Sequence, residues 1–171
     1  MKKNLLMTAL FCLVCLAANA QKFALIDMEY ILKNIPAYER ANEQLNQISK
    51  KRQSEVEAVA LEAQTLYKNY QSEAVFLSEE QKNKKEEEIV GKEKEAQELK
   101  RKYFGPEGEL YKKRVSLIEP IQEEIYNAVK AIAQQKGFQL VLDRASDNGI
   151  IFASPSIDIS VDVLAKLGYN R

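Results

Sequence analysis

Apolar residues recur every three or four positions along two long stretches of the chain, between charged and amide side chains. The first stretch, residues 37–76, contains no glycine or proline. Steps of three and four place its apolar side chains on one face of an α-helix, close to the repeat of a coiled coil. This stripe consists of Tyr38, Ala41, Leu45, Ile48, Val59, Ala63, Leu66, Tyr70 and Ala74. A helix of this length would extend about 60 Å, so it needs a partner to bury its stripe.

The second stretch supplies that partner. A helical pattern begins near Glu79 and continues to about Gln135. Its apolar positions include Ile89, Ala96, Leu99, Tyr103, Leu110, Ile118, Ile121, Ile125, Val129 and Ile132. Between the two stretches, Ser78 can act as an N-cap and Gln81 can complete a capping box. The sequence therefore predicts two antiparallel helices that form a hairpin, with its tip near residues 77–79.

The far end of this hairpin is unusually polar. Ile89 and Val90 are the only aliphatic residues between Glu79 and Glu95. We therefore expect this end to be mobile, or to be held by ion pairs between residues four apart rather than by packing.

Helix-breaking residues interrupt the second stretch. Gly105-Pro106-Glu107-Gly108 should bend or break the helix, and Pro120 removes another backbone donor. The sequence leaves open whether the first of these breaks the helix or only kinks it. No reactive residue lies nearby, which favours a kink or jog over a catalytic loop.

The two ends of the chain carry short apolar runs instead. Phe23–Ile26 predicts a buried strand, and Phe138–Leu142 alternates and is rich in strand-forming residues. Asp147-Asn148-Gly149 is a hairpin-turn signal, so Ile150–Ala153 is predicted to be a third strand.

Capping residues predict two short helices at these ends. Asp27 can cap a helix that ends before Pro36, because the residue before proline is pushed away from helical geometry. Asp158 or Ser160 can cap a final helix, with Gly168 as the residue just beyond its end.

Together these elements predict an α+β fold. A small body of about three strands carries a long antiparallel helical hairpin, inserted between the first strand and the second. The predicted parts are a signal peptide (1–20), a first piece of the body with one strand and a short helix (21–36), the helical arm (37–135), and a second piece of the body with two strands and the last helix (136–171).

Residues 1–20 have the features of a signal peptide. Lys2 and Lys3 precede an apolar run, and Ala18-Asn19-Ala20 supplies the small residues of a cleavage site. The apolar run is shorter than the roughly 20 residues that a membrane span needs. We therefore expect export, with cleavage after Ala20.

Cleavage changes the cysteine content and the charge. Cys12 and Cys15 lie in the predicted signal peptide, and neither follows the small residue of a lipoprotein signal, so the mature chain has no thiol. The full chain has 25 basic and 25 acidic residues; without Lys2 and Lys3, 23 basic residues face 25 acidic ones, a net charge of −2. This balance argues against nucleic acid as a partner, since phosphate binding needs a basic surface.

The missing residue types narrow the chemistry further. The chain has no histidine, and the mature part has no cysteine. His-based acid–base catalysis, His or Cys metal ligation and thiolate nucleophiles are therefore excluded. Neither glycine-rich phosphate-binding motif occurs. Composition leaves a carboxylate-only or Ser–Lys site open, but we expect no enzymatic activity, no catalytic residue, no cofactor and no metal.

The predicted elements resemble the Skp/OmpH family. Besides the signal peptide and the charged hairpin, the resemblance is carried by Phe23–Met28, Ile121–Ala133, Leu140–Asp143 and Asp158–Leu164. It covers nearly all of residues 21–167, although in the arm it rests on composition alone. The resemblance implies an ATP-independent holding chaperone of the periplasm, which binds unfolded outer-membrane β-barrel proteins.

The family also implies a homotrimer, with a central β body and three arms around a cavity for the client. Apolar strand residues are therefore candidates for contacts between copies: Phe23, Leu25, Ile26, Leu140, Leu142, Ile151 and Phe152. Apolar arm residues are candidates for contacting the client: Leu66, Tyr67, Tyr70, Phe76, Leu99, Tyr103 and Phe104.

The charge of the chain departs from the family pattern. Known members tend to be strongly basic, whereas the mature chain is slightly acidic. Its basic runs, in residues 82–85, 100–102 and 112–114, are flanked by glutamate. Solvated helix faces are the favoured interpretation, so any membrane association should be peripheral at most. The alternatives are a structural coiled-coil adaptor with one fixed protein partner, and an accessory of one folded outer-membrane complex.

Overall fold

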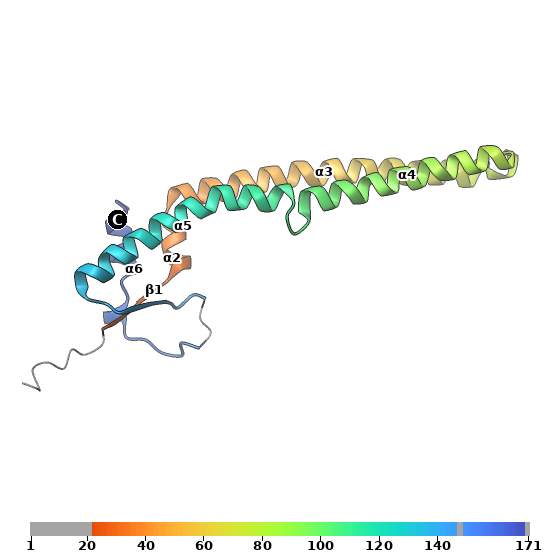
Figure 1. The fold of residues 1–171 in the computed structure, drawn as a ribbon. Helices are drawn as coiled ribbons and strands as arrows, with labels where there is room; N and C mark the ends of the chain where they lie inside the picture. Colours follow the sequence, from red (N-terminus) through yellow and green to blue (C-terminus); the bar gives the residue numbers. More distant parts are fainter. Residues whose placement is uncertain (1–21, 147–148, 170–171) are drawn as a thin grey trace, which may run out of the picture. The chain divides into compact units, whose positions relative to one another are not determined.

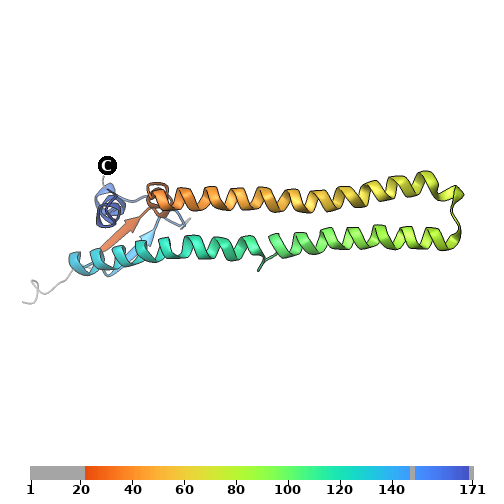
Figure 2. The same cartoon turned by 90° about the horizontal axis from the view of Figure 1, so that it is seen from above.

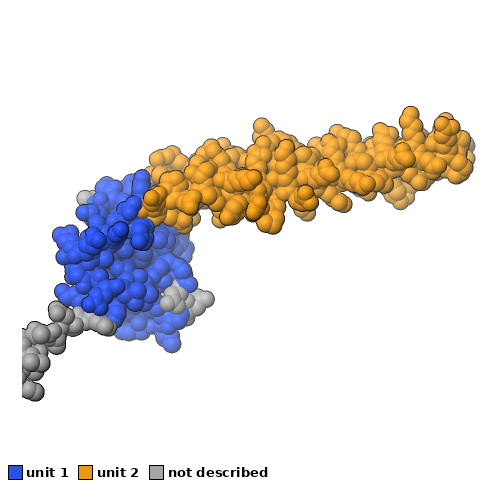
Figure 3. All heavy atoms as spheres, in the orientation of Figure 1, with its two compact units in different colours: residues 1–35, 124–171 blue, residues 36–123 orange. Residues whose placement is uncertain are grey.

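The computed structural model describes residues 22–146 and 149–169 of the 171-residue chain. The predicted signal peptide and its cleavage site lie outside the described residues. The chain forms two compact units, shown in Figure 3. We call residues 36–123 the arm unit and residues 1–35 with 124–171 the body unit.

The arm unit is built on a helical hairpin. Helix α3 (Pro36–Glu73) is followed by a short 3-10 helix, η1 (Ala74–Phe76), and by α4 (Glu79–Phe104). Figures 1 and 2 both show α3 and α4 lying side by side in opposite directions. Ser78 caps α4 as predicted: its Oγ accepts from the Gln81 N–H at 3.3 Å, and the Ser78 N–H donates to Gln81 Oε1 at 2.9 Å. The predicted antiparallel hairpin is therefore confirmed, and Leu77 and Ser78 lie between η1 and α4.

A narrow apolar seam lies between the two helices. Its buried residues are Val56 and Ala63 on α3, and Ile89, Ala96 and Tyr103 on α4. Those on α4 are seven residues apart, which is the coiled-coil repeat that the sequence predicts.

The glycine-rich segment breaks the second helical stretch, whereas the internal proline does not. Helix α4 ends at Phe104, and α5 (Glu109–Lys136) begins only after Gly105–Gly108. Gly105 adopts an extended conformation (φ −64°, ψ 170°), so the chain leaves the helix there. Pro120 lies inside α5 without ending it, although proline has no N–H to donate to the Ser116 carbonyl.

Two parallel strands form the sheet of the body unit. Strand β1 (Phe23–Ile26) pairs with β2 (Leu140–Asp143), and Phe23 lies opposite Leu140 in the register. The other edge of β1 is bridged by Asp158, and the Ile159 N–H donates to the Leu25 carbonyl at 2.8 Å. Both edges of β1 are thus paired, and its residues Ala24 to Ile26 are buried.

The predicted third strand is wrong. Ile150–Ala153 belongs to no strand of the structure, and the predicted turn residues Asp147 and Asn148 lie outside the described residues. The segment around Asp158 occupies the edge of β1 that a further strand could have used. Strand β2 is also shorter than predicted, since it begins at Leu140 rather than at Phe138.

Short helices complete the body unit. Asp27 caps α2 (Met28–Lys33) as predicted, because its Oδ1 accepts from the Tyr30 N–H at 2.8 Å. Another 3-10 helix, η2 (Pro155–Ile157), precedes α6 (Ser160–Lys166).

The C-terminal end of α6 agrees with the prediction, whereas its N-cap differs from both predicted caps. Its N-cap is Ile159, between the two predicted caps, although Asp158 Oδ1 accepts from the Ser160 N–H at 2.9 Å. Gly168 follows the helix with a φ of 86°, and the next N–H, that of Tyr169, donates to the Leu164 carbonyl at 2.9 Å. This is the predicted glycine-terminated helix end. Within the described residues, no helix is both long and apolar enough to cross a membrane.

Candidate functional site

The arm presents isolated apolar side chains on a charged surface. Among the predicted client-contact residues, Tyr67 and Phe76 are exposed, at 50% and 87% of their surface. Leu66, Tyr70, Leu99 and Phe104 are half-buried. Tyr103 is only 6% exposed and packs edge-to-face against Phe104, so it forms part of the seam. Tyr103 is therefore unavailable to a client in this conformation.

Further exposed apolar residues lie on the arm, besides the seven predicted client-contact candidates. Val75, next to Phe76 at the tip, is 82% exposed, and Leu61 is 62% exposed. Val90 and Tyr111 are also exposed. Leu61 and Val75 lie between or just beyond stripe positions such as Ala63 and Ala74. Such an off-stripe position is the signal that could have identified them, because it turns a side chain away from the partner helix.

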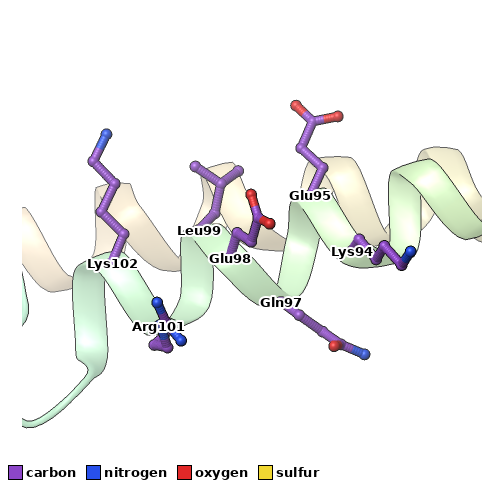
Figure 4. A pocket seen from close by; sticks show the side chains of 7 residues that line it. All are labelled: Lys94, Glu95, Gln97, Glu98, Leu99, Arg101 and Lys102. Carbon is purple, nitrogen blue, oxygen red and sulfur yellow. The ribbon is translucent and has the colours of Figure 1, made fainter.

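The hollows of the arm are shallow. One is lined by seven residues of α4 alone, from Lys94 to Lys102, and Figure 4 shows their side chains pointing to different sides of the helix. Another lies between α3 and α4, where Tyr67 stands beside the small side chains of Ala63 and Ala96. Across the described part of the chain, no three Cys, Asp or Glu residues gather in a way that could hold a metal ion. The arm thus offers surface contacts rather than an enclosed pocket.

Ion pairs hold the distal part of the arm. Lys85 Nζ lies 2.6 Å from Glu73 Oε2, and Lys92 Nζ lies 2.9 Å from Glu62 Oε2, so both pairs join α4 to α3. Glu62, and after it Glu95, raise the pKa of Lys92. The Tyr70 hydroxyl donates to Glu86 across the same two helices. Other pairs join residues three apart, such as Lys82 with Glu79. The expected ion pairing is present, but in these pairs it runs across the hairpin or over three residues rather than four.

A polar cluster faces the break between α4 and α5. Arg52 on α3 donates from Nη2 to Glu109 Oε1 at 2.6 Å, and from Nη1 to both oxygens of Glu55 at 2.8 and 3.0 Å. Its guanidinium carbon lies 4.5 Å from the centre of the Tyr103 ring. Sequence reasoning missed this cluster, although Arg52 interrupts the apolar stripe.

The charges of this cluster shift one another. Arg52, and after it Tyr103, hold the pKa of the Glu55 carboxyl below its usual range. Hydrogen bonding to Glu55 raises the pKa of the Tyr103 hydroxyl. The network thus stabilises the ionised form of Glu55 and the neutral form of the Tyr103 hydroxyl, as expected when hydrogen-bond donors and acceptors are satisfied.

The predicted contact residues of the body unit fall into two groups. Leu25 and Ile26 are buried within a single copy, at 5% and 6% exposure. The other five are exposed, and Ile151 and Phe152 reach 99% and 85%. The exposed group consists of Phe23, Leu140, Leu142, Ile151 and Phe152. Contacts between copies stay a prediction, and these five are the residues able to make them.

Comparison with known proteins gives consistent matches over most of the chain. The family model of OmpH-like outer membrane proteins matches residues 22–167. The chaperone protein Skp of Yersinia enterocolitica is 27% identical over 169 residues, covering 98% of this chain and 99% of that protein. The Skp of Pectobacterium atrosepticum is 25% identical over 170 residues, with the same coverage.

A solved structure agrees in fold. It is described as an OmpH-like outer membrane chaperone of Caulobacter crescentus, and it superposes with a TM-score of 0.67 at 12% identity. The superposition covers 88% of this chain and 86% of the other. Because the family model matches residues 22–167, the chain belongs to the OmpH-like family of outer membrane proteins.

Proposed function

We propose that this protein is an ATP-independent holding chaperone of the periplasm, which binds unfolded outer-membrane β-barrel proteins along its arm and prevents their aggregation. The observation that carries the proposal is similarity to Skp chaperones over nearly the whole length of both chains. The long hairpin supports it, because a client can lie along such a surface without entering a pocket.

The arm suits weak and repeated contacts. Exposed apolar side chains such as Leu61, Tyr67 and Phe76 stand apart from one another among charged residues. Each contributes little alone, but several contacts with one flexible chain raise the overall affinity while each remains free to exchange. Holding of this kind uses no bond-breaking step, so the proposal includes no catalytic activity.

The proposal also includes assembly into a homotrimer. Leu140 and Leu142 on β2 are exposed, and Ile151 and Phe152, later in the body unit, are almost fully exposed. An exposed strand edge with apolar side chains favours association. Three copies would cover this surface and bring three arms together around a client.

The decisive test is suppression of aggregation. A urea-denatured outer-membrane β-barrel protein is diluted into buffer with the purified protein, without nucleotide, and light scattering is followed. We expect the client to stay soluble at a stoichiometric ratio and to be released to detergent micelles in folded form. Several unrelated β-barrel clients should be held, whereas a folded soluble protein, as control, should not bind. Retention of a single partner and none of the unfolded clients would favour a coiled-coil adaptor.

Export can be tested separately. We expect protein recovered from the periplasm to begin at Gln21, as intact-mass measurement would show. A lipidated or uncleaved N-terminus would contradict this part of the proposal without affecting the holding activity.

A further inference from the structure

A charged side chain occupies the seam of the arm where an apolar one is expected. Arg52 follows buried Leu45 by seven residues and precedes buried Val56 by four, so it takes a seam position of α3. Its side chain is 26% exposed, and it contacts groups on both sides of the break in the facing chain.

The groups that Arg52 contacts come from both helices. Tyr103, whose ring lies under the guanidinium, is the penultimate residue of α4, and Glu109 is the first residue of α5. Glu55, one turn along α3, binds the guanidinium through both oxygens and fixes its orientation. One side chain on the continuous helix α3 therefore contacts both α4 and α5, the helices on either side of the break.

Because the helix is broken at Gly105–Gly108, no continuous helix fixes the position of α5 relative to α4. From Tyr103 the seven-residue repeat would continue at Leu110 and Leu117, yet both are only partly buried, and burial resumes at Ile121. Apolar contacts near the break therefore only weakly specify how α5 is aligned along α3. A polar seam residue with a defined partner specifies register in coiled coils, at some cost in stability.

We infer that Arg52 sets the register of the arm across the break, by holding the end of α4 and the start of α5 against α3 in a single alignment. The Arg52–Glu109 pair places the first turn of α5, and the Arg52–Tyr103 contact places the last turn of α4. Without the guanidinium, the segment Gly105–Gly108 lets α5 shift along α3 independently of α4. The inference concerns the arm without a client and does not depend on the proposed function.

Distance measurements between spin labels test this inference. Cysteines replace exposed residues in pairs: Ser54 with Lys112 reports α3 against α5, and Ser54 with Lys100 reports α3 against α4. Cys12 and Cys15 are replaced by serine in all proteins, and labelled chains are diluted with unlabelled ones to isolate distances within one copy. The test variant is Arg52→Met, because methionine keeps an unbranched apolar stem and lacks the charge.

In Arg52→Met we expect the Ser54–Lys112 distribution to gain a second population, displaced by roughly one helical turn of about 5 Å. The Ser54–Lys100 distribution should keep its single maximum, since the tip still connects α3 to α4. Glu109→Gln, which keeps the shape of the side chain, should broaden the same Ser54–Lys112 distribution to a smaller extent. Arg40→Met, an exposed arginine on the same helix, is the matched control and should change neither distribution.

Two outcomes would overturn the inference. One is an unchanged Ser54–Lys112 distribution in an Arg52→Met protein whose far-ultraviolet circular dichroism shows full helicity. The other is equal broadening of both label pairs, since this would mean that Arg52 only stabilises the arm as a whole. If Arg52→Met fails to fold, Glu109→Gln decides between the same outcomes.

Discussion

At the residue scale, Asp143 links distant parts of the body unit. Its Oδ1 accepts from the Met28 N–H and from the Ala145 N–H, each at 3.0 Å, and the Ser146 hydroxyl donates to Oδ2. The first of these bonds joins residues 115 positions apart. Burial alone would raise the pKa of the Asp143 carboxyl, but the hydrogen bonds from Ser146, Met28 and Ala145 hold it below its usual value.

This pKa shift predicts a dependence of stability on pH. The carboxyl ionises at a lower pH in the folded chain than in the unfolded chain, so its contribution is complete above about pH 4 and is lost as pH falls through the folded-state pKa. Asp143→Asn should lower the free energy of unfolding at pH 7 by about 1–2 kcal/mol. As pH falls through the folded-state pKa of Asp143, the variant and the parent should converge.

Urea unfolding between pH 2 and pH 7, at one fixed protein concentration, measures this effect. Glu87→Gln, an exposed site on α4, serves as the control for loss of a carboxylate. A constant difference between Asp143→Asn and the parent at every pH would contradict the assignment.

Side-chain roles at this scale were partly predictable from the sequence. Asp27 caps α2 as predicted, because an N-cap is determined by residues close by in the chain. Ser160 was considered only as a cap, but it is buried. Its Oγ accepts from the Asp27 N–H at 2.8 Å and donates to Asp158 Oδ1 at 2.6 Å. The bond to Asp27 spans 133 positions, and no local pattern encodes a partner so far away.

At the element scale, two glycines of the arm unit should respond oppositely to the same substitution. A Cβ on Gly108, in the break, would lie 2.8 Å from the Tyr103 carbonyl oxygen, and that atom belongs to the backbone. A Cβ on Gly91, within α4, would meet nothing within 4 Å. We expect Gly91→Ala to raise the free energy of unfolding by about 0.5–1 kcal/mol, because alanine favours the helix.

Gly108→Ala should lower the free energy of unfolding by about 1–3 kcal/mol, since the break must rearrange to make room. Thermal unfolding followed by circular dichroism measures both variants under identical conditions. A Gly108→Ala protein as stable as Gly91→Ala would mean that the break tolerates another backbone path.

The helices were predictable because their signals repeat over many residues. The capping box at Ser78 rests on local geometry and is confirmed. Leu45 and Ala63 of the predicted stripe are buried, but Val56 is buried between them while Val59 is only half-buried. The segment Ile150–Ala153 has the composition of a strand, yet strand formation depends on a free edge elsewhere in the fold. Asp158 takes that edge of β1, and no pattern near Ile150 could reveal it.

At the scale of the whole molecule, assembly and client holding should be separable. Replacing residues 60–100 by a short glycine–serine linker removes most of the hairpin and leaves the body unit unchanged in sequence. We expect this variant to keep the mass of the proposed trimer in light scattering. Dissociation into monomers would show that the arms carry the assembly.

The converse variant changes the body unit alone. Ile151 and Phe152 are almost fully exposed in one copy, so Ile151→Asp with Phe152→Asp should not disturb the fold of that copy. The charges should nevertheless prevent burial between copies. We expect monomers with unchanged helicity; a stable trimer of this variant would place the contact elsewhere.

Client holding should depend on many arm residues together. Phe76→Ala should weaken binding of one denatured β-barrel client by about 1 kcal/mol or less, which raises the apparent Kd by about fivefold at most. The effect should be small because no arm residue is anchored as a hot spot. Changing Leu61, Tyr67, Val75 and Phe76 to serine at once should abolish holding. Gln71→Ala is the matched control. Loss of holding from one substitution, with its neighbours inert, would favour a specific-epitope adaptor.

The parallel pairing of β1 with β2 has a consequence for the order of folding. On one edge of β1, Phe23 pairs with Leu140, and on the other edge Leu25 pairs with Asp158. Each pairing closes a loop of more than a hundred residues. Closing so long a loop is entropically unfavourable, and such distant contacts form slowly. The hairpin of α3 and α4 depends on neither strand, so it can form while the body is incomplete. In each newly exported chain, the arm surface proposed to hold clients should therefore fold before the body surface proposed for assembly.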